Sequence, residues 1–291
     1  MNFPVDSWLE ACGWGLGSLA CASALLIVVL LRRKQKHVAD KHVLITGGSE
    51  GLGLELAKEC VRRGARRVTI VGRREGKLRE AVRSLEMTRD NFYEKEMGVT
   101  RKSDKGPLCT VSHFSVDCCD ETAVKKLFSQ LESEGDSPQV VVCNVGAAVA
   151  RLFGDLQASD FRRMMEVNFL SSVYVAQSAV PLMKKAGGGM LMFVSSQAGQ
   201  VAVGGYSAYS ASKFALRGFS EVLQMELEPL GIQVSTVYPP SIDTPGYVEE
   251  QKGKPSLTQQ IEADSGLWSA DTVARVSVQG FESGRSALIE E

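Results

Sequence analysis

The sequence predicts an α/β fold: a doubly wound parallel sheet with helices on both faces, preceded by one N-terminal transmembrane helix. Three observations carry this prediction. After residue 40, apolar strand-like segments alternate with segments of helical spacing, a glycine-rich turn joins the first strand to the first helix, and an uncharged run lies near the N-terminus. A chain of 291 residues can form one large domain with a sizeable core.

Six short segments have the near-continuous apolar composition of strands that are buried on both faces: 42–48, 66–74, 109–117, 139–146, 190–196 and 232–239. Helical spacing is found between them at 52–64, 75–87, 121–135, 159–189 and 208–228. Helical crossovers of this length produce right-handed βαβ units and hence a parallel sheet. The charged stretch 88–107 predicts a solvated loop, and 241–270 predicts a mobile lid over the substrate.

The run from Ala11 to Leu31 contains no charged residue and has about the length that a helix needs to span a bilayer. Arg32, Arg33 and Lys34 follow it directly, so its C-terminal side is expected to face the cytosol. No basic residue precedes the run, which favours a membrane anchor over a cleaved signal peptide. We therefore expect an anchor and basic linker over 1–37 and a catalytic domain over 38–291.

Charge and histidine placement argue against two other classes of function. The formal net charge is -1 and no basic stripe with interleaved aromatics is present, so nucleic acid is not an expected partner. His37, His42 and His113 are dispersed along the chain, so no metal site is expected.

The turn "TGGSEGLG" (46–53) places Gly47, Gly51 and Gly53 between a strand and a helix. Glycines at such positions allow a tight turn and close approach to a pyrophosphate, which then meets the N-terminus of the helix. The turn therefore indicates a Rossmann-type dinucleotide site, with a purely structural turn as the alternative. Arg73 and Arg74 end the second strand and suit the 2′-phosphate of NADP(H), unless both are only solvated surface.

Tyr209 and Lys213 lie one helical turn apart and so share a helix face. Ser196 ends the strand that precedes this helix, where open α/β sheets bind their ligands. A lysine ammonium close to a phenol is expected to lower the pKa of that phenol. This predicts Tyr209 as the general acid in ketone reduction, Lys213 as the group that tunes it, and Ser196 as the polariser of the carbonyl.

These motifs, together with "NVG" at 144–146 and "EVNF" around Asn168, resemble the short-chain dehydrogenase/reductase superfamily over about residues 40 to 250. The resemblance implies that Asn168 completes a Ser–Tyr–Lys–Asn tetrad with a water relay to Lys213. It further implies the following contacts with NADPH or NADP+: Gly47, Ser49, Gly51, Leu52, Gly53, Arg73, Arg74, Asp117, Asn144, Gly146, Tyr209, Lys213 and Thr244.

A narrower resemblance lies in "FVSSQAGQ", "AYSASKFALRGFSEVLQMELEP" and "YPPSIDTPGYVEE", which are similar to 3-ketodihydrosphingosine (3-dehydrosphinganine) reductases. It implies NADPH-dependent reduction of a long-chain lipid ketone in sphingolipid synthesis, at the cytosolic face of the endoplasmic reticulum membrane. Helix-paired dimers and tetramers are common in the superfamily, so a homo-oligomer is one possible partner, and the sequence itself leaves the oligomeric state open. Two alternatives stay open: a membrane-anchored steroid or retinoid short-chain dehydrogenase, and a non-catalytic cofactor-binding scaffold.

Overall fold

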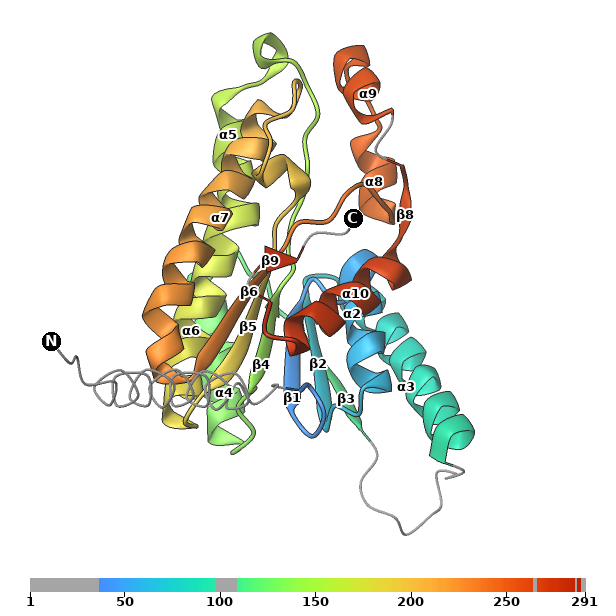
Figure 1. Cartoon of the computed structure of the whole chain (residues 1–291), viewed down its shortest axis with the longest axis vertical. Coiled ribbons are helices and arrows are strands. Elements are labelled where there is room, and N and C mark those ends of the chain that lie inside the picture. Colours follow the sequence, from blue (N-terminus) through green and yellow to red (C-terminus); the bar gives the residue numbers. More distant parts are fainter. Residues whose placement is uncertain (1–36, 98–108, 264–265, 286, 289–291) are drawn as a thin grey trace, which may run out of the picture. The chain divides into compact units, whose positions relative to one another are not determined.

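The computed structural model describes residues 37–97, 109–263, 266–285 and 287–288. Its centre is a seven-stranded sheet in the order β3-β2-β1-β4-β5-β6-β9, in which every neighbouring pair is parallel. The chain thus moves outward from β1 in one direction and then, through β4, in the other, which confirms the predicted doubly wound α/β sheet (Figure 1). The strands are β1 (His42–Thr46), β2 (Arg67–Gly72), β3 (Thr110–Ser115), β4 (Val140–Cys143), β5 (Gly189–Val194), β6 (Ile232–Val237) and β9 (Ala287–Leu288).

Helices cover both faces of the sheet because successive strand side chains point to opposite faces. Ile45 belongs to the core under α2 (Gly51–Arg62), α3 (Glu75–Met97) and α10 (Ala270–Glu282). Its neighbour Leu44 belongs to the core under α4 (Glu121–Ser133), α6 (Ser171–Lys185) and α7 (Ser207–Leu227). Figure 1 shows the two helix layers on either side of the strands. This two-sided burial explains why the strand segments are almost continuously apolar.

Two predicted elements differ from the structure. The single helix expected over 159–189 is divided into α5 (Ala158–Met165), a π-helical segment (Glu166–Leu170) and α6. The loop expected over 88–107 is wrong for its first part, since α3 continues to Met97. The segment contains no glycine or proline before Gly98, Tyr93 packs against the core, and the buried Arg89 donates to the carbonyl oxygen of Cys109 at 3.3 Å. Residues 98–108 lie outside the described chain.

The segment after β6 carries two short helices, α8 (Pro245–Glu250) and α9 (Ser256–Glu262). It is tied to the domain by a two-stranded ladder of β7 (Ile242–Asp243) and β8 (Trp268–Ser269). α8 and α9 stand at the same end of the sheet as α5 and the start of α7 (Figure 1). We call residues 241–263 the lid. The sequence did not reveal α10 and β9, which follow it.

The predicted membrane anchor over 11–31 lies outside the described residues. Within the ranges that the structure describes, no helix combines the length and the apolar composition that crossing a bilayer requires.

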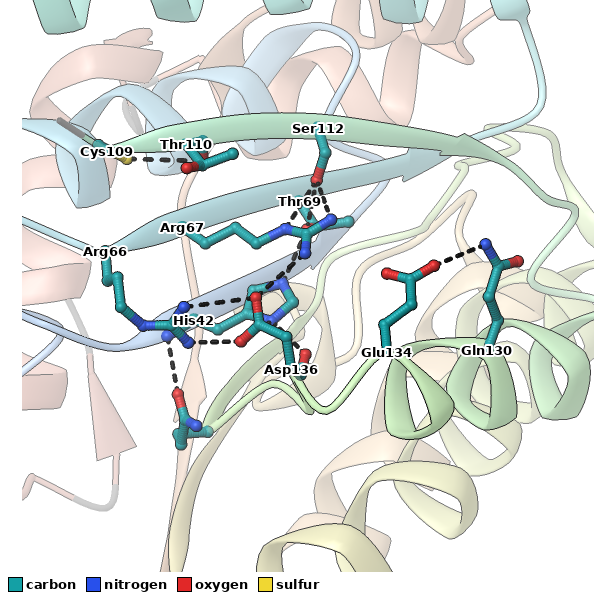
Figure 2. Close-up of polar contacts among 11 residues, drawn as sticks. His42, Arg66, Arg67, Thr69, Cys109, Thr110, Ser112, Gln130, Glu134 and Asp136 are labelled. Atoms are coloured by element: carbon teal, nitrogen blue, oxygen red, sulfur yellow. Dashed lines mark hydrogen bonds and ion pairs between the residues drawn. The ribbon is translucent and has the colours of Figure 1, made fainter. Parts of the chain in front are cut away.

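A polar network around His42 links β1, β2 and β3 with the segment that precedes β4 (Figure 2). The His42 ring is fully buried, with Nδ1 at 2.8 Å from the carbonyl oxygen of Asp136 and Nε2 at 2.7 Å from Oγ1 of Thr69. Asp136 also pairs with the guanidinium groups of Arg66 and Arg67. Burial lowers the pKa of His42 to about 4, so the ring is neutral at neutral pH and the histidine has a structural role.

Candidate active site

The candidate site lies at the carboxyl ends of β1, β4 and β5. The chain direction of the sheet reverses between β1 and β4, and open α/β sheets bind ligands in the crevice at such a switch point. The glycine turn follows β1, Asn144 to Gly146 follow β4, and Ser196 lies two residues beyond β5. The fold thus brings together segments that are separated by about a hundred residues of sequence.

The glycine turn is packed so tightly that two of its glycines have no substitute. A Cβ at Gly53 would lie 2.2 Å from the carbonyl oxygen of Gly47 and 2.5 Å from Nδ2 of Asn144. Gly47 has a φ of 65°, in the left-handed region that favours glycine. Asn144 Nδ2 donates to the carbonyl oxygens of Thr46 and Gly47 at 3.1 and 3.2 Å, so it fixes the turn from the neighbouring strand.

The helix that follows the turn has an N-terminus suited to an anion. Glu50 is its N-cap residue, and in the described chain its side chain makes no capping hydrogen bond, while the first turn holds no acidic residue. Backbone N–H groups at such an end can bind a phosphate. Leu52 lies in this first turn with its side chain in the core, so only its backbone can serve a cofactor. Thr244 lies against the turn, since its Cβ would be 3.3 Å from a Cβ at Gly51.

The predicted adenosine-side residues flank the end of β2. Gly72 lies against Ser49 of the turn, with 3.6 Å between a Cβ at Gly72 and Ser49 Oγ. Arg73 and Arg74 follow directly with exposed side chains, and Arg74 forms an exposed ion pair with Glu50 of the turn at 2.5 Å, which a phosphate could replace. Arg73 lies 3.9 Å from a carboxylate oxygen of Asp117, which accepts a hydrogen bond from the backbone N–H of Cys119 at 3.0 Å. Two exposed guanidinium groups at this position can bind a phosphate dianion.

Tyr209 and Lys213 share one face of α7, as predicted, and Lys213 Nζ lies 5.9 Å from the centroid of the Tyr209 ring. Lys213 is buried and donates to the carbonyl oxygen of Val194 at 2.9 Å, and burial lowers its pKa to about 8. The expectation of a lowered pKa for Tyr209 is wrong for this structure. Burial raises the pKa of Tyr209 and outweighs the opposing hydrogen bond with Ser196, so the phenol is protonated at neutral pH.

Asn168 lies in the π-helical segment, fully buried, and links the loop after β4 to α7. Its Oδ1 accepts from the backbone N–H of Ala147 at 2.8 Å, and its Nδ2 donates to the carbonyl oxygen of Ala147 and to Ser212 Oγ, both at 2.9 Å. Ser212 in turn donates to the carbonyl oxygen of Tyr209 at 2.6 Å. Single π-helical turns are frequent at functional sites. Here the wider turn places the Asn168 amide against both the loop after β4 and α7.

Gly146 lies where Asn168 and Lys213 approach each other. A Cβ at this position would be 3.2 Å from Asn168 Oδ1 and 3.3 Å from Lys213 Nζ. Both distances are tighter than ordinary van der Waals contact, so glycine leaves the space between the amide and the ammonium open. The residues predicted as a tetrad are therefore neighbours. Ser196 acts on the pKa of Tyr209, the Lys213 ammonium lies near the Tyr209 ring, and Lys213 and Asn168 both lie next to Gly146.

Sequence reasoning missed the polar residues that join the lid to α7. Tyr206 precedes α7, and its ring centroid lies 5.4 Å from that of Tyr209. Its hydroxyl lies within hydrogen-bond distance of carboxylate oxygens of both Glu250 and Glu262, which end the two lid helices, and its one proton can be donated to either of them. No spacing in the sequence signals these contacts, because Tyr206 is 44 residues from Glu250 and 56 residues from Glu262.

Comparison with known proteins agrees with this geometry. A family model described as short chain dehydrogenase matches residues 41–255, and the chain belongs to that family. Among curated proteins, it is 38% identical to the 3-dehydrosphinganine reductase of Danio rerio, over 89% of this chain and 74% of that protein. It is 36% identical to the 3-ketodihydrosphingosine reductase of Bos taurus, over 91% of this chain and 78% of that protein, and 33% identical to that of Dictyostelium discoideum, over 90% and 78%.

Solved structures share the fold at lower identity. The L-sorbose reductase of Gluconobacter frateurii, solved with NADPH and L-sorbose, superposes with a TM-score of 0.71 at 21% identity, covering 89% of this chain and 97% of that one. A short-chain dehydrogenase of Sphingobium yanoikuyae, in complex with NADPH, has a TM-score of 0.69 at 22% identity, covering 86% and 87%. At these identities the likeness establishes the Rossmann-type fold.

Proposed function

We propose that this chain uses NADPH to reduce the 3-keto group of 3-dehydrosphinganine, a step of sphingolipid synthesis. The observation that carries the proposal is the grouping of Ser196, Tyr209, Lys213 and Asn168 beside a phosphate-type glycine turn, in a chain whose curated relatives bear this reductase name. A protonated phenol next to an ammonium is the arrangement that ketone reduction requires, because negative charge develops on the carbonyl oxygen.

The residues around the glycine turn fit NADPH. The uncapped N-terminus of α2 and the close approach at Gly53 suit a pyrophosphate, and Arg73 and Arg74 suit the 2′-phosphate. In the family pattern Asn144, Gly146, Asp117 and Thr244 also contact the cofactor, and here Asn144 and Thr244 lie against the glycine turn. When bound, NADPH supplies the hydride. No carboxylate occupies positions 73 and 74, where an NAD-specific chain would hold the ribose 2′-hydroxyl.

The chain's own residues supply the proton and stabilise the phenolate that remains. Tyr209 is protonated at neutral pH and donates its proton to the ketone oxygen, while the Ser196 hydroxyl orients that oxygen. Lys213, with a pKa near 8, carries its charge at neutral pH and stabilises the resulting phenolate. Asn168 holds the loop after β4 against α7 and so keeps Lys213 beside Gly146.

A lipid substrate suits the surface of the lid. Val248, Leu257 and Ile261, on α8 and α9, are about half exposed or more, which is unusual for large apolar side chains that gather on one short segment. We propose that this surface admits the alkyl chain from the cytosolic face of the endoplasmic reticulum membrane. Residues 1–37 would serve as anchor and linker to a catalytic domain over 38–291; the sequence supports this with an uncharged run followed by basic residues.

Homo-oligomer formation through helices belongs to the same proposal. Phe214, Val222 and Met225 lie along one side of α7 and are exposed by 39%, 46% and 69%. An exposed apolar row on a long helix is a candidate for helix pairing. Sedimentation of the wild type and of a Val222→Lys variant would test it, with a smaller species expected only for the variant.

The experiment that tests the proposed activity is a substrate and cofactor panel with product analysis. Purified protein should convert 3-dehydrosphinganine to sphinganine with NADPH, more slowly with NADH, and should leave steroid and retinoid ketones unreduced. Reduction of a steroid or retinoid instead would transfer the assignment to another branch of the family. NADPH binding with no reduction of any ketone would indicate a cofactor-binding scaffold.

A further inference from the structure

A buried charge cluster ties both lid helices to the start of α7. Lys254 lies between α8 and α9, and its side chain is only 1% exposed. Its Nζ is 2.8 Å from Glu250 Oε1 and 2.5 Å from Glu262 Oε2. Both carboxylates also face the hydroxyl of Tyr206, with 2.8 Å between that oxygen and Glu262 Oε1. One ammonium therefore lies between two carboxylates from two helices, and both carboxylates also lie against the same phenol.

Tyr206 transmits this contact to the catalytic phenol. It is 3% exposed, it immediately precedes α7, and its ring is tilted by 58° against the ring of Tyr209 at 5.4 Å. Lys254 Nζ also lies 5.5 Å from the centroid of the Tyr206 ring, within the range of a cation–π contact. Aromatic pairs at such separations favour one mutual orientation. The position of Tyr209 is thus coupled to the closure of the lid.

The cluster also acts on Tyr209 through its charge. Burial is the main cause of the raised pKa of Tyr209, and the carboxylates of Glu250 and Glu262 raise it further. The groups that face Tyr209 from other directions are Ser196, whose hydrogen bond lowers the pKa, and Lys213 on its own helix. For Lys254, burial lowers the pKa, but the hydrogen bonds and charges of the two glutamates outweigh it and raise the pKa. Lys254 therefore stays charged and offsets the two carboxylates.

We propose that Lys254 is a positioning residue: by neutralising Glu250 and Glu262 it closes the lid on Tyr206 and holds Tyr209 in its reactive position. This rests on the proposed reduction. Removing the ammonium from a buried ionic cluster is strongly destabilising, because two carboxylates would then approach the Tyr206 hydroxyl without the positive charge that lies between them. The lid would then open, or the remaining carboxylates would act on Tyr209 without a counter-charge.

The first test compares Lys254→Met with Lys254→Arg and with Lys252→Met. In the wild type, Lys252 pairs with Glu249 on the surface, where both side chains are about 70% exposed, and such pairs contribute little. Lys254→Met is expected to lower kcat/KM for the lipid ketone by about tenfold to a hundredfold, the effect of displacing a catalytic group by about 1 Å. Lys254→Arg should recover part of the loss, and Lys252→Met should equal the wild type. Wild-type kinetics in Lys254→Met would overturn the proposal.

A second measurement separates positioning from a general folding defect and needs no substrate. Limited proteolysis with chymotrypsin, which can cut after Tyr247 and Leu257, reads the closure of the lid at urea concentrations far below the unfolding midpoint. Lys254→Met should be cut within residues 241–263 at least about tenfold faster than the wild type, while Lys252→Met should equal the wild type. Cleavage of Lys254→Met at the wild-type rate would overturn the proposal. Faster cleavage of the lid in a protein that reduces no lipid ketone would support the lid contact and refute only the proposed reaction.

Discussion

Lys213→Met is predicted to stabilise the protein while it removes activity. Lys213 is 4% exposed, and burial alone lowers its pKa from 10.5 to about 8. Since one pKa unit corresponds to about 1.4 kcal/mol, carrying the charge in this site costs about 3 kcal/mol of folding free energy at neutral pH. Methionine fills a similar volume with no charge, but it gives up the hydrogen bond to Val194, which is worth about 1 kcal/mol. A net gain of about 2 kcal/mol remains.

The pH dependence of this gain has a definite sign. Below about pH 8 the lysine is protonated in both the folded and the unfolded state, so the full cost is present in the wild type. Between about pH 8 and 10.5 the unfolded state binds more protons than the folded state, and wild-type stability rises with pH. The advantage of Lys213→Met should therefore shrink over this interval and reverse above it, where only the lost hydrogen bond remains.

Urea unfolding of both proteins at pH 7 and at pH 10 measures the difference directly. At pH 7 the midpoint of the variant should be higher, with an unchanged slope. In the same preparation, ketone reduction should be lost. A variant that is less stable than the wild type at pH 7, or a stability gap that does not change with pH, would refute the reasoning that burial of the ammonium dominates. A gain in stability with loss of activity is expected where a catalytic group is held in an unfavourable environment.

The glycine turn, the arginine pair and the histidine network can each be tested by a single substitution. Gly53→Ala should weaken NADPH binding by about tenfold to a hundredfold, because its Cβ would overlap the Gly47 backbone at a cost of about 1–3 kcal/mol. Gly76→Ala in α3, which has open space around it, should bind NADPH normally when both variants are titrated by fluorescence. Arg73→Glu should raise the KM for NADPH by at least about tenfold and leave the KM for NADH nearly unchanged, because a hydrogen bond to a charged group contributes about 1.5–3 kcal/mol. Arg79→Glu, at an exposed position, should change neither KM. Equal effects on both cofactors would contradict the assignment of Arg73 to the 2′-phosphate. The wild type should lose about 3 kcal/mol of stability as the pH falls from 6.5 to about 4, because His42 takes up its proton in the unfolded state first. In denaturant titrations, His42→Gln should flatten this dependence of stability on pH. An unaltered dependence would show that other groups cause it.

The parts of the site that the sequence predicted are those in which chemistry depends on local spacing. Tyr209 and Lys213 are four residues apart on one helix, and Gly47, Gly51 and Gly53 form one turn, so their arrangement follows from helix and turn geometry. The parallel sheet was equally predictable, because strands buried on both faces must be apolar throughout.

Other features depend on tertiary contacts that no local pattern contains. Tyr206 and Glu262 are 56 residues apart and meet only because the end of α9 lies beside the residue that precedes α7. The raised pKa of Tyr209 reflects burial, which a motif does not reveal, so reasoning from the neighbouring ammonium alone produced the wrong sign. The extension of α3 to Met97 was missed because its surface is polar, although Tyr93 anchors it to the core.

In the proposed reaction the hydroxyl of Tyr209 protonates the ketone oxygen. Its most direct test is the single-turnover rate of NADPH oxidation with 3-dehydrosphinganine in Tyr209→Phe, measured beside NADPH affinity in the same preparation. We expect the rate to fall by about 10² to 10⁴, the usual contribution of a general acid, while NADPH affinity changes little. A Tyr209→Phe protein that reduces the lipid at the wild-type rate would contradict the account.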